Sequence, residues 1–207
     1  MRIAKRDRPP ADLQLVTTEI LPDKPWLRFV LARHPDALGW GPGSKSRFAD
    51  AELDQGGAAR FNPLYLGSSF RCCFVETLLR DQANGQAGDW PLSRSALTTW
   101  TCARVELTRP LTVVDLTSTG PVGMRMPSDA VRARHQQLGR LWSSAFHAHP
   151  DGVDGILYPS RFIQDPCLCV YEDRGIGVLK LTDRGSLVTF QDELADALDT
   201  FKISLVG

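Results

Sequence analysis

A tyrosine and a glutamate are the residues of this chain whose types and spacing are best suited to chemistry. Tyr65 lies in the short apolar run 64–67, and Glu76 lies in a second apolar run that begins after Ser68 and Ser69. The first run predicts a strand and the second a helix, so the two side chains are expected to meet at the corner between them. A carboxylate among apolar neighbours needs a reason, because an unpaired buried charge is costly.

Two interpretations of Glu76 follow from the residues. Arg80 lies four positions later, in the favourable order for a structural ion pair on a helix. Alternatively, the carboxylate points into a cleft, where it could hydrogen-bond a ribose hydroxyl and stabilise positive charge that develops at C1′. No second carboxylate accompanies it, so a two-carboxylate glycosidase is not indicated. Both interpretations remain open at this level.

An arginine interrupts the apolar run Trp26–Leu31. This run alternates as a strand does. The neighbours of Arg28 in the sequence point to one face of the strand, so Arg28 points to the other face, toward either a pocket or solvent. A planar guanidinium suits bidentate recognition of phosphate. The chain has neither a G-x-x-x-x-G-K-[ST] loop nor a G-x-G-x-x-G motif after a strand, so the standard nucleotide-binding folds have no support.

Two arginine-aromatic pairs, Arg47-Phe48 and Arg60-Phe61, flank a glycine-rich stretch. Each pair by itself is typical of a surface arginine whose stem covers a ring. Farther along the chain, Pro159 ends an apolar strand and leaves Ser160 exposed. Its hydroxyl could bind a substrate or cap the following turn.

The predicted strands and helices do not alternate strictly, which favours an α+β fold. We expect a loosely packed N-terminal arm over residues 1–25 and one catalytic domain over 26–207. The expected strands are 26–31, 64–67, 97–107, 111–116, 155–159, 168–171, 176–181, 187–190 and 202–206. The expected helices are 69–82, 127–149 and 191–201, and the expected long loops are 34–57 and 83–96.

The composition is that of an ordinary globular protein. Lys+Arg and Asp+Glu both number 24 in 207 residues, so no global field draws the chain to nucleic acid or to an anionic membrane. No apolar run reaches the roughly 18 residues that span a bilayer, and the basic start lacks the apolar segment of a secretory signal. The five cysteines lack zinc-site spacing, so we expect no metal and a reducing cytoplasmic location.

Taken in order, these motifs resemble the RES domain, which is named for an arginine, a glutamate and a serine. The resemblance runs from about Trp26 to Asp173. Its anchors are 64–67 with 76–81, and 147–150 with 154–161. The resemblance implies a compact fold like that of mono-ADP-ribosyltransferases, with mixed or antiparallel sheets and flanking helices.

The resemblance also implies a function. RES proteins look like toxins of toxin-antitoxin pairs that degrade NAD by releasing nicotinamide, with phosphate or water as the acceptor. NAD is then a substrate, inorganic phosphate is a possible co-substrate, and no cofactor is implied. The implied partner is an Xre-type helix-turn-helix antitoxin that blocks the active site. The alternatives are a protein mono-ADP-ribosyltransferase and an inactive relative that only binds an antitoxin.

Site residues carry over from the family by position. The implied catalytic residues are Arg28, Glu76 and Ser160. The implied substrate-binding residues are Phe29, Arg47, Phe48 and Tyr65. Arg28 and Arg47 would hold the diphosphate, Tyr65 would pack on the nicotinamide ribose or ring, and Glu76 would grip a ribose hydroxyl.

Two of these assignments have alternatives. Arg60 competes with Arg47, because the string Arg60-Phe61-Asn62-Pro63 matches the family locally but lies close to Tyr65. Some relatives place the serine early in the long helix, where this chain has His135-Gln136-Gln137.

Overall fold

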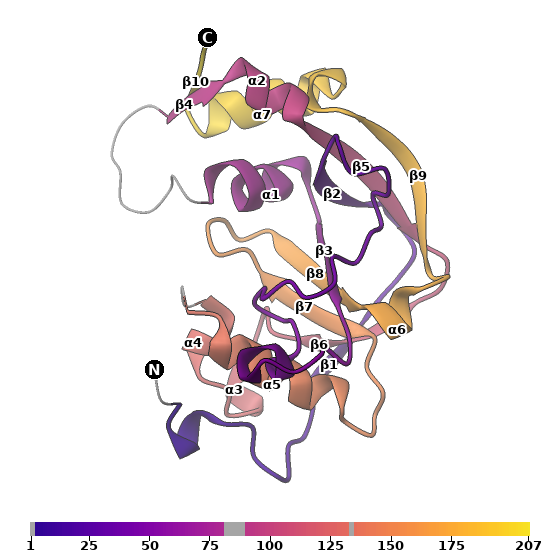
Figure 1. Cartoon of the computed structure of the whole chain (residues 1–207), viewed down its shortest axis with the longest axis vertical. Helices are drawn as coiled ribbons and strands as arrows, with labels where there is room; N and C mark the ends of the chain where they lie inside the picture. Colours follow the sequence, from indigo (N-terminus) through magenta and orange to yellow (C-terminus); the bar gives the residue numbers. More distant parts are fainter. Residues whose placement is uncertain (1–2, 81–89, 133–134) are drawn as a thin grey trace.

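The structure, a computed structural model, describes residues 3–80, 90–132 and 135–207. Within this part of the chain the main element is an eight-stranded mixed sheet with strand order β1-β6-β7-β8-β3-β2-β5-β9 (Figure 1). Neighbouring strands are antiparallel except for β6 and β7. The strands are β1 (Thr17–Ile20), β2 (Trp26–Leu31), β3 (Pro63–Gly67), β5 (Trp100–Leu107), β6 (Leu111–Asp115), β7 (Gly155–Pro159), β8 (Pro166–Tyr171) and β9 (Leu179–Ser186).

Short helices lie at both ends of this sheet. Figure 1 shows α2 and α7 at one end, beside a small parallel pair of β4 and β10, with α3, α4 and α5 at the other end and α1 between them. None of the helices that the structure describes is long and apolar enough to cross a membrane. The remaining elements are α1 (Phe70–Phe74), β4 (Trp90–Ser93), α2 (Arg94–Thr99), α3 (Gly120–Gly123), α4 (Ser128–Arg132), α5 (Gln137–His147), α6 (Glu172–Gly175), α7 (Gln191–Thr200) and β10 (Ile203–Val206).

The middle of the sheet is buried on both faces. Along β8, Cys169 and Tyr171 pack in a cluster with α5, whereas Leu168 and Val170 pack in a second cluster on the other face. A third cluster joins α1, α2 and α7 to β2 and β5. The five cysteines are all buried and free, so they act as small core side chains.

The corner between β3 and α1 is tight. Ser69 caps α1 by accepting a hydrogen bond from the Cys72 amide. A β-carbon at Gly67 would lie 2.8 Å from Cys73 Sγ, so glycine allows the close approach of strand and helix. After α1 the chain widens into a π-helical turn, Val75–Leu79, a distortion that is frequent at functional sites.

Most of the expected elements are confirmed, and the differences have local causes. The expected strand 187–190 is a 3₁₀ turn (Leu187–Thr189), and the strand expected at 176–181 lies later, as β9. Ser93 caps α2, so residues 94–99 are helical and β5 begins at Trp100. The described part of the expected loop 83–96 is not a loop but forms β4 and the start of α2, while residues 81–89, which include the end of the expected helix 69–82, lie outside the described residues.

The single helix expected over 127–149 is wrong. The structure has α4 and α5 as separate helices, with residues 133–134 outside the described part. The apolar stripe runs from Val131 to Leu138 with helical spacing, so the sequence pattern conceals the interruption.

The expectation of a loosely packed arm over residues 1–25 is also wrong. Within it, β1 pairs antiparallel with β6 at the edge of the main sheet. Leu13 is buried, and Trp142 Nε1 donates a hydrogen bond to the Asp7 carbonyl. The segment packs because the edge of β6 offers backbone groups that a strand can pair.

Candidate functional site

The described strands and helices surround a pocket of about 630 Å³. Its walls come from β2, β3, α1 with the π turn, the end of β7, and the loop between β2 and β3. The lining residues are Arg28, Phe29, Trp40, Gly41, Ser44, Ser46, Arg47, Pro63, Tyr65, Leu66, Gly67, Cys72, Cys73, Glu76, Thr77, Arg80, Trp100, Val131, Gln136, Tyr158, Pro159, Arg161, Phe162 and Cys167.

Glu76 lines this pocket together with Tyr65 and Arg28, as the strand-helix corner predicts. Its Oε1 accepts hydrogen bonds from Ser160 Oγ at 2.7 Å and from the Arg161 amide at 2.9 Å. The carboxylate is therefore oriented by the chain that leaves β7. This placement favours the interpretation of Glu76 as a carboxylate in a cleft.

Ser160 contacts the pocket residue Glu76 without lining the pocket itself. Its side chain is buried rather than exposed, and it is not among the lining residues. While its hydroxyl donates to Glu76, the same oxygen accepts from the amides of Phe162 at 3.2 Å and Ile163 at 3.4 Å. The Ser160 hydroxyl therefore caps the following turn and also contacts a pocket residue, as both interpretations of this serine allow.

Arg28 projects from β2 into the pocket. Its Nη2 donates to the Gly39 carbonyl at 3.0 Å, but its Nη1 is buried and has no hydrogen-bond partner. Burial lowers the pKa of this guanidinium, although an arginine stays charged at any physiological pH. A buried donor without a partner is costly and is rare in folded proteins.

Arg47 shows the same feature on the opposite loop. Its Nη1 is also buried without a partner, and burial lowers its pKa. Within the described part of the chain, four side-chain nitrogens are orphaned in this way, and two of them belong to these pocket arginines. Because Arg80 and Arg161 line the same pocket, its chemistry suits an anionic ligand.

Tyr65 contributes its ring to the pocket, and its hydroxyl serves the Arg47 loop. The hydroxyl donates to Ser46 Oγ and accepts from the Phe48 amide, both at 2.9 Å. Burial raises the pKa of Tyr65, so the phenol stays neutral. Both neighbours of Arg47 in the sequence are therefore fastened to Tyr65.

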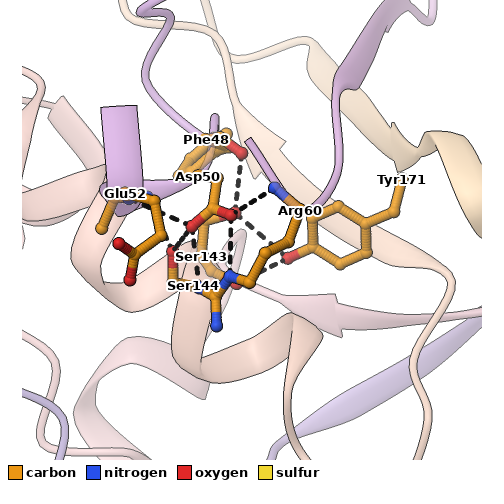
Figure 2. A network of polar contacts seen from close by, with 8 residues as sticks. Phe48, Asp50, Glu52, Arg60, Ser143, Ser144 and Tyr171 are labelled. Atoms are coloured by element: carbon orange, nitrogen blue, oxygen red, sulfur yellow. Dashed lines mark hydrogen bonds and ion pairs between the residues drawn. The ribbon is translucent and has the colours of Figure 1, made fainter. Parts of the chain in front are cut away.

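Of the remaining predicted residues, some line the pocket and others do not. Phe29 lines the pocket, but Phe48 does not: it is fully buried and packs edge-on against Tyr158, with ring centroids 4.9 Å apart. Arg60 pairs with Asp50 at 2.7 Å and is not a lining residue (Figure 2). Of the two competing arginines, the pocket therefore contains Arg47.

Several lining residues escape prediction from the sequence. Trp40 lies between two glycines in the loop before Arg47, and a large aromatic residue in such a loop is a usable signal. Trp100 and Phe162 carry no comparable signal. Gln136, the residue just before α5, also lines the pocket, in the segment considered above as an alternative place for the family serine.

No group of three His, Cys, Asp or Glu side chains that could hold a metal ion occurs in residues 3–80, 90–132 or 135–207. The polar residues that line the pocket carry guanidinium groups, one carboxylate, and hydroxyl and amide groups.

Fold and pocket together define an α+β protein with an arginine-lined pocket that also contains a carboxylate. The family model described as the RES domain matches residues 20–189, and the chain therefore belongs to the RES domain family. The resemblance stated from the motifs is confirmed.

Two known proteins extend this comparison. "Probable toxin y4kH" of Sinorhizobium fredii (strain NBRC 101917 / NGR234) is 38% identical over 128 residues, which cover 62% of this chain and 100% of that protein. A chain in the crystal structure of the M. tuberculosis MbcT-MbcA toxin-antitoxin complex is similar at a TM-score of 0.62 and 20% identity, covering 86% of this chain and 92% of that chain. This similarity confirms the predicted fold class.

Proposed function

We propose that this protein is the toxin of a toxin-antitoxin pair and that it cleaves the nicotinamide–ribose bond of NAD in this pocket. Membership of the RES family supports the proposal, as do a relative named as a probable toxin and a structural neighbour from a toxin-antitoxin complex. The implied partner is an Xre-type antitoxin, and the implied location is the cytoplasm.

One observation carries the proposal. Two arginines from different segments, Arg28 and Arg47, line the pocket that also contains Glu76, and each has a buried Nη1 without a hydrogen-bond partner. A diphosphate offers enough acceptor oxygens for both guanidinium groups. The carboxylate then lies in the same pocket as the sugar attached to that diphosphate. Aromatic walls from Phe29, Trp40 and other rings suit the flat bases of a dinucleotide.

The residues divide the chemistry as follows. Arg28 and Arg47 hold the diphosphate, and Glu76 accepts a hydrogen bond from a ribose hydroxyl. As the C1′–N bond breaks, its electron pair neutralises the pyridinium nitrogen and nicotinamide leaves. Positive charge develops at C1′, where the Glu76 carboxylate stabilises it. Phosphate or water then forms the new bond to C1′ and gives up a proton to solvent.

The test is incubation of the full chain with NAD, with and without inorganic phosphate, followed by identification of the products. We expect free nicotinamide together with ADP-ribose or its phosphorylated form. Labelled polypeptide in place of a free product would indicate protein ADP-ribosylation. No loss of NAD at high protein concentration would indicate an inactive antitoxin-binding protein.

The decisive variant is Glu76→Gln, which keeps the shape of the side chain and removes its charge. We expect a loss of about 10²–10³-fold in kcat, because a preorganised electrostatic group is removed. Glu106→Gln, on an exposed position of β5, is the matched control and should retain full activity. Near-normal NAD consumption by Glu76→Gln would overturn the role of this carboxylate.

A further inference from the structure

Arg47 is carried by a loop, yet the backbone of this loop is fixed against a helix. The main chain on both sides of Arg47 lies against α5, and four residues of one face of α5 make the contacts described below. Loops of this length normally vary in conformation. Here a side chain that must meet a ligand has its backbone held before the ligand arrives.

Gly139 is the point of closest approach. A β-carbon at this position would lie 2.8 Å from the Arg47 carbonyl oxygen, 2.9 Å from Arg47 Cγ and 2.9 Å from the Ala130 carbonyl oxygen. Two of these three atoms belong to backbone and cannot rotate away. The absence of a side chain at Gly139 therefore allows the Arg47 backbone to touch the helix.

Arg140 fastens the same stretch of loop. Its Nη1 donates to the carbonyls of Lys45 at 2.9 Å and Ser46 at 3.3 Å. Its Nε and Nη2 form a bidentate pair with Asp54, at 2.9 and 2.7 Å. The Arg140 side chain is almost fully buried, and this one guanidinium links two separate points of the loop to α5.

The next turn of α5 continues the contact. Ser143 Oγ donates to the Phe48 carbonyl at 2.7 Å and lies 3.2 Å from the Tyr171 hydroxyl. Ser144 Oγ donates to Asp50 at 2.9 Å, and Asp50 also accepts from Arg60 (Figure 2). The loop is thus bonded to the helix on both sides of Arg47.

We propose that Gly139 and Arg140 are positioning residues that set the place of the Arg47 guanidinium and thereby the anion affinity of the pocket. Neither residue lines the pocket, so both act through Arg47. The inference rests on the proposed function in taking Arg47 as the binder of a diphosphate. A misplacement of about 1 Å can cost about 10²-fold in a site of this kind.

The variants are Gly139→Ala, which forces the loop away, and Arg140→Lys, which keeps the charge but cannot reproduce both sets of contacts. We expect each to weaken binding of ADP-ribose and of inorganic pyrophosphate by about 10- to 100-fold, measured by calorimetry. KM for NAD should rise more than kcat falls, because Arg47 holds the substrate at a distance from the breaking bond.

Two matched controls separate positioning from stability. Gly123→Ala adds a methyl group in exposed α3, where the nearest atom is the end of the Val16 side chain at 3.2 Å. Arg109→Lys breaks a similar bidentate pair with Asp154. Asp154 comes just before the start of β7, whereas the opposite end of that strand lines the pocket. Both controls should bind the two probes as the wild type does, even where Arg109→Lys lowers Tm.

A double variant supplies the sharpest outcome. In an Arg47→Ala background, Arg140→Lys should have no further effect on pyrophosphate affinity, since its effect passes through Arg47. Equal losses in both backgrounds, or wild-type affinity in Gly139→Ala and Arg140→Lys, would overturn the inference. A wild type that binds pyrophosphate without consuming NAD would overturn the proposed function. The pyrophosphate affinities of the variants would still test whether Gly139 and Arg140 position Arg47. A wild type that binds neither probe would overturn both.

Discussion

Glu76 is held by one of its oxygens before any ligand is present. A hydroxyl and an amide from the chain after β7 donate to Oε1, which sets the plane of the carboxylate. In a preorganised site such groups need no rearrangement as charge develops on the substrate. The orientation of this acid is therefore a property of the folded protein.

Ser160→Ala tests this arrangement. The variant removes one hydrogen bond to Glu76 and the acceptor for the Phe162 and Ile163 amides. We expect kcat to fall by about 10-fold, because a hydrogen bond to a charged group contributes about 1.5 kcal/mol. KM should change less, and Tm should fall, since two partly buried amides lose their partner.

Ser160→Thr keeps the hydroxyl and should restore part of the loss in kcat. Steady-state kinetics and thermal unfolding of the two variants check both statements. A loss in Ser160→Ala as large as that in Glu76→Gln would mean that the hydroxyl acts on the substrate directly.

At this scale the sequence predicts much of the pocket. Strand alternation puts Arg28 on the face opposite to its neighbours but leaves open whether it meets a pocket or solvent, and the strand-helix corner brings Tyr65 and Glu76 together. The choice between Arg47 and Arg60 does not follow, because both are arginine-phenylalanine pairs. Asp50 decides it by pairing with Arg60, and Ser144 steadies that acid from α5, a contact between distant segments.

The strands and helices that carry the pocket residues approach one another closely at glycines, where a side chain would not fit. β7 is one such element, because it lies against β8 along its whole length. A β-carbon at Gly155 would lie 2.0 Å from the Cys169 carbonyl oxygen, which is backbone of the neighbouring strand. The start of β7 is therefore closed to any larger residue.

Gly155→Ala should destabilise the protein by more than about 3 kcal/mol, since relief requires a shift of a central strand. Urea unfolding followed by fluorescence measures the change. Gly39→Ala, where the nearest atom would be 3.4 Å away, is the control and should be close to neutral. Equal midpoints for the two variants would contradict the close contact of β7 and β8.

The sequence predicts the ends of strands and helices better than it predicts a break within a helical pattern. Gly155 and Pro159 mark β7 correctly, and Ser69 marks the start of α1. The gap between α4 and α5 goes unseen because apolar residues keep helical spacing across it.

The whole molecule places its pocket between two differently built halves. One half consists of β2, β5 and β9 with α1 and α7, and it contributes Arg28 and Glu76. The other contains β6 and β7 with α5, and it supports the loop of Arg47. The α+β class follows from the non-alternating order of elements, but strand order does not, because it is fixed by long-range pairing such as that of β1 with β6.

Deletion of residues 1–20 tests this architecture. It removes β1 and exposes the edge of β6, and it removes the carbonyl of Asp7 that Trp142 Nε1 uses. We expect a lower Tm and a shift to larger species in size-exclusion chromatography, because an unpaired edge strand associates with other chains. An unchanged Tm with a monomeric elution volume would contradict the role of β1.

The wide turn at Val75–Leu79 has a geometric consequence. In a regular α-helix four residues overshoot one revolution by about 40°, so Cys72, Glu76 and Arg80 would wind away from a common wall. Bonds that reach five residues ahead lengthen the repeat and cancel much of that drift. All three side chains line the pocket, and loss of one residue from the wide turn would rotate Arg80 relative to Glu76 about the helix axis.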